Sequence, residues 1–429
     1  MFLGALDMGI VSPALPGIAR GLKVAPASAM AVVTLYYLAY AAAMPLLGKL
    51  GDRWGTGRML RAGLLAFGVG SLLAAAAPSL GWLLAGRVLQ AVGGGGVVPV
   101  AVAAVARRAP PARRGRALGL VGAVFGVAGV LGPNLGGLVL AVSSWRWIFL
   151  LNLPLAAAAW SGTWRLESRR AAGRSLDWAG AGGVTLGVGG LLYAVMELGG
   201  HPLLSGGVLL PAGVGVAGLA WLGRSQPRAV DPVVPPRFLG EGRGVLAAGI
   251  LAGILMSAMA LVPLYLQDRL GLSAPASGYG LTPMAVAAAV CAGMGGVLVD
   301  RFGPRSVLTA GFAGFAAGYA LLFWGGTGLG VTMLGLALAG LGTGLSTGAP
   351  LNYLALEVAG GGREAAGTAV ISLARTLGAS MGPALLALFL AAGREFQAAA
   401  ALGLVGTVLA LGLSGGKASA GGTGSQRGI

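Results

Sequence analysis

Long apolar segments joined by short basic loops dominate this sequence of 429 residues. Hydrophobic residues make up 56% of the chain and charged residues only 10%, whereas a soluble domain carries about 25% charged residues. A run of about 20 apolar residues crosses a bilayer as a helix. Fourteen apolar segments can be counted between residues 1 and 414. The sequence therefore predicts an all-α integral membrane protein with fourteen transmembrane helices.

A short motif occurs twice and divides the chain into two related halves. The stretch 48–55, GKLGDRWG, is matched by 296–303, GVLVDRFG, and its aspartates, Asp52 and Asp300, lie 248 positions apart. Gly-Pro pairs that begin at residues 132 and 382 keep nearly the same offset. Internal repeats of this kind are how many secondary transporters are built.

The segments divide into two sets of six with one extra pair, 178–223, between them. The predicted organisation is an N-terminal six-helix bundle (1–170), an extra helix pair with a Pro- and Arg-rich cytoplasmic linker (171–243), a C-terminal six-helix bundle (244–414) and a disordered cytoplasmic tail (415–429).

The basic residues predict the orientation of the chain. With the N-terminus placed in the cytoplasm, 22 of the 29 lysines and arginines fall in inner loops and 5 in outer loops, as the positive-inside rule requires. Both termini are therefore expected in the cytoplasm. Because the charge is spread along one membrane face rather than gathered on one element, nucleic acid is not an expected partner. The Ala-, Gly- and Arg-rich composition points to a bacterial cytoplasmic membrane.

Several motifs resemble those of one family. The stretch 48–58 resembles the loop 2–3 signature of the major facilitator superfamily, and 86–93, GRVLQAVG, resembles its helix 4 signature. The stretch 132–137, GPNLGG, resembles the helix 5 signature associated with antiporters. The stretches 6–16 and 145–154 look like the fourteen-span drug:proton antiporter branch, and the extra central pair also fits that branch.

This resemblance implies proton-coupled efflux of small hydrophobic or amphiphilic compounds by alternating access, with protons, lipid and a small-molecule substrate as partners and a monomer as the working unit. A metabolite importer or facilitator of the same fold is the alternative, and a non-transporting membrane scaffold is a more distant one. An enzyme is not expected, and neither is a cofactor or a metal site, since Cys291 and His201 are single residues of their types and no Ser/His or Cys/His set is present.

Asp7 is the acid best placed within a span, and Arg87 lies in the middle of another. An ionisable residue in a bilayer is costly and points to function. Burial raises the pKa of a carboxyl group and a nearby guanidinium lowers it, so a site that alternates between the two environments can load and release a proton. We predict that Asp7 carries the proton and Arg87 modulates it. The alternative is that Arg87 caps backbone carbonyls and Asp7 is solvated at the inner surface.

Only six residues precede Asp7. Either the protein starts further upstream, or Asp7 lies nearer the cytoplasmic surface than in relatives.

The repeated motif is predicted to form a conformational latch. Its carboxylates can pair with arginines or with a helix N-terminus of the other half, which the resemblance implies would hold the outward-open state. A local turn that only fixes topology is the alternative. The latch residues are Gly48, Gly51, Asp52, Arg53, Gly55, Arg58, Asp300, Arg301 and Gly303.

Two further sets are predicted. Glycines spaced along one helix face allow a close crossing, and an antiporter hinge is predicted at Gly132, Pro133, Gly136 and Gly137, with plain small-residue packing as the alternative. A mid-membrane pocket between the halves is predicted to be lined by Tyr37, Tyr40, Asn134, Asn152, Tyr265, Gln267 and Asn352. Packing is the alternative for each of them. The scarcity of buried acids argues against dicationic drugs as substrates.

Overall fold

The computed structural model describes residues 2–166, 177–197, 204–271, 280–324, 328–390 and 395–413. Within these ranges the regular structure is helical, and turns and short loops join the helices. The predicted tail 415–429 and the predicted boundary between residues 170 and 171 lie outside the described residues.

The N-terminal half begins with a broken helix, because Pro13 and Pro16 interrupt the first apolar segment by removing backbone donors. Its elements are α1 (Phe2–Ile10), η1 (Ser12–Ala14), α2 (Leu15–Leu22), α3 (Pro26–Ala29), α4 (Ala31–Trp54), α5 (Thr56–Ala75), α6 (Leu80–Arg108), η2 (Pro111–Arg113), α7 (Arg114–Val142), α8 (Arg146–Leu150), α9 (Asn152–Gly162) and η3 (Thr163–Arg165).

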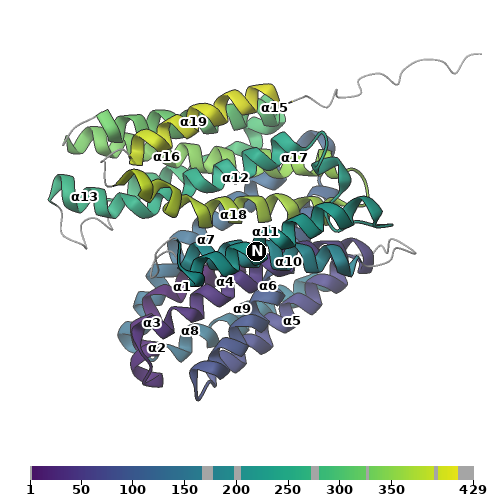
Figure 1. Cartoon of the computed structure of the whole chain (residues 1–429), viewed down its shortest axis with the longest axis vertical. Coiled ribbons are helices and arrows are strands. Elements are labelled where there is room, and N and C mark those ends of the chain that lie inside the picture. The colour runs from purple at the N-terminus through teal and green to yellow at the C-terminus, as the bar shows by residue number, and fades with distance from the viewer. Residues whose placement is uncertain are drawn as a thin grey trace, which may run out of the picture.

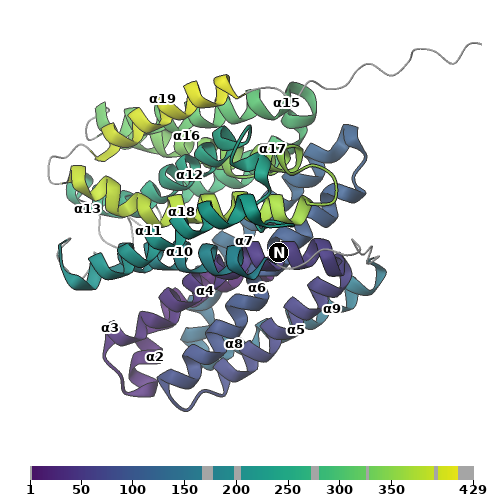
Figure 2. The ribbon, with the colours of Figure 1, turned by 45° about the vertical axis from the view of Figure 1, so that its right-hand side comes forward.

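Two helices and a packed connector follow this half. They are α10 (Trp178–Glu197), α11 (Gly206–Ser225), η4 (Gln226–Arg228) and η5 (Pro236–Phe238). In Figures 1 and 2, α10 and α11 lie across the junction between the two halves. Val188 and Leu192 of α10 belong to the apolar core of the C-terminal half, and a Cβ on Gly189 would touch Leu38 of α4. The extra pair therefore packs against both halves.

The C-terminal half repeats the turn of the N-terminal half. Gly303 has φ 81° and ψ 157° inside α15, and Gly55, between α4 and α5, has φ 89° and ψ 146°; glycine alone adopts such angles readily. The elements of this half are α12 (Arg243–Ser257), η6 (Ala258–Leu261), α13 (Val262–Leu270), α15 (Thr282–Trp324), α16 (Leu329–Thr347), α17 (Ala349–Ala359), α18 (Glu364–Leu390) and α19 (Glu395–Gly412).

Seven helical regions of the described chain are long and apolar enough to cross a membrane: Ala31–Trp54, Thr56–Ala75, Leu80–Arg108, Trp178–Val195, Gly206–Arg228, Thr282–Trp324 and Leu329–Ala359. The region Thr282–Trp324 contains two helices that meet at Gly303. The fold is all-α as predicted, and the count of fourteen spans stays a prediction.

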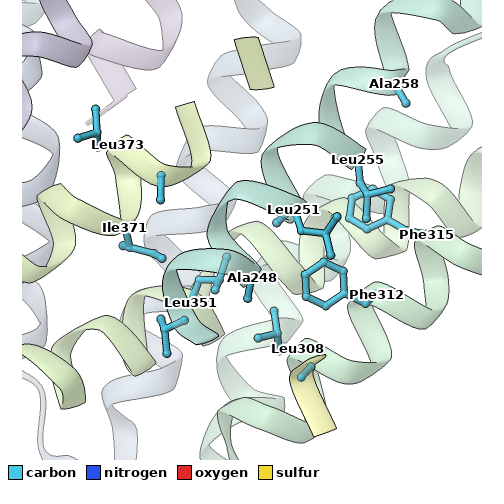
Figure 3. Close-up of a cluster of buried hydrophobic side chains, with 14 of the residues drawn as sticks. Ala248, Leu251, Leu255, Ala258, Leu308, Phe312, Phe315, Leu351, Ile371 and Leu373 are labelled. Atoms are coloured by element: carbon cyan, nitrogen blue, oxygen red, sulfur yellow. The ribbon is translucent and has the colours of Figure 1, made fainter. Parts of the chain in front are cut away.

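Buried apolar side chains fill both halves and also join them, since one cluster contains Tyr40 and Met44 of α4 together with Leu345 of α16. In Figure 3, Leu251 and Leu255 of α12 lie against Phe312 and Phe315 of α15. Helices in lipid associate through close packing rather than through the hydrophobic effect, and small residues allow this packing. A Cβ on Gly93 of α6 would lie 2.4 Å from the backbone oxygen of Gly63 on α5, so these two helices meet at their backbones.

Candidate functional site

Asp7 and Arg87 form a buried ion pair. A guanidinium Nη1 of Arg87 lies 2.7 Å from Oδ2 of Asp7, and the two side chains are 1% and 0% exposed. The amide Nδ2 of Asn152 donates to the other carboxylate oxygen, Oδ1, at 2.8 Å. Both carboxylate oxygens are thus engaged, and the carboxylate is not solvated in this conformation.

Further contacts fix the guanidinium. It donates to Oε1 of Gln90 at 2.9 Å and to the carbonyl oxygen of Val32 at 3.3 Å. It also lies 3.9 Å from the ring centroid of Tyr36, which suits a cation–π contact. Gln90, one turn along α6, donates onward to Ser71 at 2.6 Å. The site therefore joins α1, α4, α5, α6 and α9 around one neutralised charge pair.

Asp52 caps a helix of the opposite half. Its two carboxylate oxygens accept hydrogen bonds from the backbone N–H groups of Ala365 and Ala366, at 3.1 and 2.9 Å, in the first turn of α18. Arg107 lies 2.8 Å from the same carboxylate. A negative charge at a helix N-terminus is favourable because unpaired N–H groups and the helix dipole meet there.

Asp300 makes the same contact in the reverse direction. Its carboxylate accepts from the N–H groups of Gly115 and Arg116, at 2.6 and 2.9 Å, at the start of α7 in the N-terminal half. Asp52 and Asp300 thus each cap a helix that belongs to the other half. We call the side of the molecule that carries these two aspartates the latch face.

Glycines of the repeated motif bring the halves together at the latch face. A Cβ on Gly48 would lie 2.6 Å from Cβ of Ala369 and 2.8 Å from the carbonyl oxygen of Ala365, both on α18. A Cβ on Gly296, the counterpart of Gly48, would lie 2.2 Å from the carbonyl oxygen of Gly115 on α7. Side chains at either position would force the halves apart.

Gly51, Gly55, Arg301 and Gly303, four of the other predicted latch residues, make their described contacts within their own half. A Cβ on Gly51 would meet Val100 of α6 at 2.4 Å, and Gly55 and Gly303 make the turns described above. Arg301 stacks over its neighbour Phe302 at 5.2 Å. Arg58 is exposed, and Arg53 lines a small cleft beside Asp52.

The connector after α11 reaches this cleft. Residues 231–235 are buried, and Asp231 contacts both halves. Its carboxylate lies 3.4 Å from Nζ of Lys49 on α4 and 3.5 Å from Arg363, which precedes α18. Lys49 also donates to the Asp231 carbonyl oxygen. The connector is anchored behind this point, since Asp177 accepts from Gln226 at 2.7 Å.

The predicted hinge glycines lie where α7 crosses α1. A Cβ on Gly132 would approach the Leu6 carbonyl oxygen at 3.1 Å, and one on Gly136 would approach that of Ile10 at 2.6 Å. Gly137 faces open space, with no atom within 4 Å. Helix α7 continues through Pro133 and Asn134, whose side chains lie outside the described part of the structure. The crossing carries α7 close to the segment that holds Asp7.

The predicted pocket residues fall into three places. Tyr40 is stacked on Tyr36 at 5.8 Å, and Tyr37 is partly exposed on the same helix, α4. Asn352 donates to the Gly348 carbonyl oxygen at the break between α16 and α17. Tyr265 donates to the Leu322 carbonyl oxygen at 3.0 Å inside the C-terminal half.

Two of the remaining pocket candidates are also placed. Gln267 is partly exposed on α13. Asn152 engages Asp7, so it belongs to the buried pair rather than to the pocket candidates around Tyr40.

The sequence matches the profile of the Major Facilitator Superfamily over residues 1–383 and 244–421. The chain belongs to the major facilitator superfamily. A relative from Bacillus subtilis strain 168, the uncharacterized MFS-type transporter YfiU, is 34% identical over 409 residues, which cover 92% of this chain and 78% of the relative. A Multidrug resistance protein B homolog of Mycobacterium tuberculosis is 33% identical over 370 residues, covering 83% of this chain and 68% of that protein.

Solved structures agree on the superfamily fold. The human organic anion transporter MFSD10 superposes with a TM-score of 0.71 at 17% identity, covering 95% of this chain and 96% of that one. The fucose:proton symporter of E. coli superposes with a TM-score of 0.68 at 15% identity and covers 96% of both chains. The protein is thus a membrane-embedded, multi-pass transporter and not an enzyme, as the sequence predicted.

Sequence reasoning did not single out Gln90, Ser71 and Tyr36, although they complete the buried pair. Gln90 stands three residues after Arg87 within the helix 4 motif, and that spacing puts both on one helix face. Tyr36 carried no such signal. Its hydroxyl is buried and has no hydrogen-bond partner among the described residues.

Replacing Asp231 by Asn is expected to loosen the latch face, because it removes the charge that Lys49 and Arg363 share. The change should lower the free energy of unfolding by about 1–3 kcal/mol, which is the usual cost when a buried hydrogen-bonded group loses its partner. Thermal unfolding of the purified full chain measures this. Glu241→Gln, at an exposed position of the same connector, is the matched control and should change little; an equal loss in both variants would contradict the assignment.

Proposed function

We propose that this chain exports small hydrophobic or amphiphilic compounds across the bacterial cytoplasmic membrane in exchange for protons. Fourteen spans, with both termini in the cytoplasm, follow from the loop charges of the sequence and complete the proposal. The multidrug-resistance names of relatives at about one-third identity support efflux. Alternating access between two halves is the mechanism that a two-half repeat favours.

The buried pair of Asp7 and Arg87 carries the proposal. In the present state the carboxylate is held by the Arg87 guanidinium and the Asn152 amide. Proton uptake by Asp7 would remove the negative charge that attracts Arg87. The guanidinium would then keep only its contacts with Gln90, the Val32 carbonyl oxygen and the Tyr36 ring. Asp7 sits on the short helix α1 that α7 crosses at its glycines, so a change at the pair is transmitted to a helix that also contacts the other half.

The latch supplies the second part of the cycle. With Asp52 and Asp300 capping α18 and α7, the halves are closed at the latch face, which the loop charges assign to the cytoplasm. Access then lies on the opposite side. Breaking both caps would allow the halves to rock and expose the central space to the cytoplasm, where substrate enters and the proton leaves.

The test uses the purified full chain in liposomes with an acidic lumen and a neutral exterior. An amphiphilic dye that does not titrate in this range should accumulate inside as protons leave, whichever way the protein is inserted. A protonophore that collapses the gradient, and liposomes without protein, are the controls. Accumulation only when the acid is outside would indicate symport and favour the metabolite importer. Dye movement that does not depend on the pH gradient would indicate a facilitator.

A further inference from the structure

A second arginine lies within the helices, and it differs from Arg87. Arg375, in the middle of α18, is partly exposed, and its Nη1 donates to the carbonyl oxygen of Thr347. Thr347 ends α16, and Gly348, with φ −93° and ψ −118°, separates it from α17. Discontinuous helices at the interface of the halves are where transporters place their binding sites, since the break frees backbone groups.

Arg375 lies on the face of α18 that is turned toward the N-terminal half. Thr368, seven residues earlier on α18, donates to the Pro99 carbonyl oxygen of α6 at 2.9 Å, so this face of α18 is turned toward the N-terminal half. Positions four and seven residues further on share that face. Thr368 is 0% exposed, Ser372 is 3% exposed and Arg375 is partly exposed.

The same trend holds on the facing helix, α4. Gly48 is packed against α18, Tyr40 is 3% exposed and Tyr37 is partly exposed. Residues on these two facing surfaces are therefore buried next to the latch face and partly exposed further from it. Because Gly48 of α4 packs against Ala365 and Ala369 of α18, Tyr40 and Arg375 lie on helices that face each other across the two halves.

The charge of Arg375 is not neutralised in the described structure. A guanidinium has five N–H donors, and the one hydrogen bond that Arg375 donates goes to an uncharged carbonyl. Its other nitrogens are not among the fully buried atoms that lack a partner, and the residue is partly exposed. No ion pair to Arg375 occurs among the described residues, whereas Asp7 already neutralises Arg87.

The Thr347 carbonyl oxygen could be satisfied by a neutral donor. Because a charged side chain between membrane helices is costly, this one hydrogen bond does not explain why an arginine stands here. An uncompensated guanidinium that is partly exposed at the interface of the halves is suited to bind a carboxylate or sulfonate, with which it can form two parallel hydrogen bonds. Asn352 adds a second polar group at the break, because its Oδ1 is buried and lacks a partner in the described part of the chain. That oxygen can accept a hydrogen bond from an N–H or O–H group of a ligand.

We infer that Arg375 binds the negatively charged end of the substrate, and that the chain transports amphiphilic organic anions with an apolar body and a carboxylate or sulfonate group. This inference rests on the proposed transport function and names its substrate class. Tyr37 and Tyr40 lie where the apolar body would pack.

Three probes with one apolar body test the charge preference: naphthalene acetate, naphthalene acetamide and a naphthylmethyl trimethylammonium ion. Equilibrium binding to the full chain in lipid nanodiscs is measured for each, with empty nanodiscs as background. The unmodified chain should prefer the acetate over the amide by about tenfold, as a charge-assisted pair requires. It should bind the cation least.

The variants separate recognition from structure. Arg375→Gln should remove the preference for the acetate and leave amide binding within about twofold, which also shows that the variant is folded, because the amide does not need the charge. Arg375→Lys should keep a reduced preference. An acetate preference that survives in Arg375→Gln, or a preference of the unmodified chain for the cation, would overturn the inference.

Binding and transport can fail separately. Selective acetate binding without gradient-driven uptake in liposomes would reject proton-coupled export and leave the anion site standing. Gradient-driven uptake of the amide and the cation, with the acetate excluded, would reject the anion site and leave the export function standing.

Discussion

Replacing Asp7 by Asn is expected to stop a pH gradient from driving transport. Asparagine keeps the shape of the side chain, and its one carbonyl oxygen can still accept from Arg87, but its NH2 group cannot accept from Asn152 and the side chain does not titrate. Gradient-driven uptake should therefore fall by about tenfold or more, equivalent to about 1.4 kcal/mol in driving force or barrier. Downhill exchange of labelled for unlabelled dye should continue, because it needs no proton. Liposome uptake with and without the gradient measures both.

The control for this experiment is Glu241→Gln, the same acid-to-amide change at an exposed position outside the helices; it should behave like the unmodified chain. Uptake that remains gradient-driven in Asp7→Asn would place the proton site elsewhere, and the next acids to examine would be Glu197, at the end of α10, and Glu357, in α17, which both lie near the ends of apolar segments.

The free energy of unfolding provides a second test of the ion pair between Asp7 and Arg87. Each of Asp7→Asn and Arg87→Gln leaves one buried charge without its partner, at a cost of about 3–5 kcal/mol. The double variant should cost less than the sum, since it leaves no unpaired charge. Additive losses would mean that the two side chains act independently despite their 2.7 Å contact.

Replacing Gly48 by Val is expected to open the latch face. The added Cβ would lie 2.6 Å from Cβ of Ala369 and 2.8 Å from the Ala365 carbonyl oxygen. A backbone atom of a packed helix can move away only at a cost in free energy. Overpacking of this kind costs about 1–3 kcal/mol, enough to shift the balance between closed and open states by about tenfold.

Labelling measures the opening. In a background that carries Cys291→Ser, Ala366→Cys places a thiol beside Asp52, at a position that is 4% exposed in the closed state. A membrane-impermeant maleimide should react about tenfold faster when Gly48→Val is added, which is the population shift that 1.4 kcal/mol produces. Gly68→Val on α5, where an added Cβ meets nothing within 4 Å, is the control. Equal rates in the two variants would show that the Gly48 contact does not hold the face closed.

The sequence predicts the all-α fold, the two halves and the pairing of Asp7 with Arg87. These features are predictable because hydropathy, loop charge and the presence of a charged residue within a span can each be recognised from one segment of the sequence. For Asp52 and Asp300 the sequence left a local turn open as the alternative to a contact with the other half, because a carboxylate in a loop can serve either purpose. The tertiary structure shows that Asp52 contacts Arg107 and the start of α18, and that Asp300 contacts the start of α7.

Other features depend on contacts between distant residues. Asn152 meets Asp7 across 145 positions, and nothing in its own neighbourhood separates that role from a place in the pocket. Asp231 reads as a loop acid in a polar, Pro-rich stretch, yet the connector folds back and buries it between Lys49 and Arg363. The uncompensated charge of Arg375 is visible only when the acids around it can be counted.

The reciprocal caps of Asp52 and Asp300 have the form of an isologous interface, in which one surface patch meets its own copy across a two-fold axis. A dimer of two identical half-length subunits would make both caps with a single aspartate and a single helix end. Covalent fusion of the halves frees the two sites to differ in sequence. Among the described residues, the Asp52 cap has Arg107, Glu364 and the Asp231 connector beside it, so the two ends of one symmetric contact are held by different neighbours and need not break together.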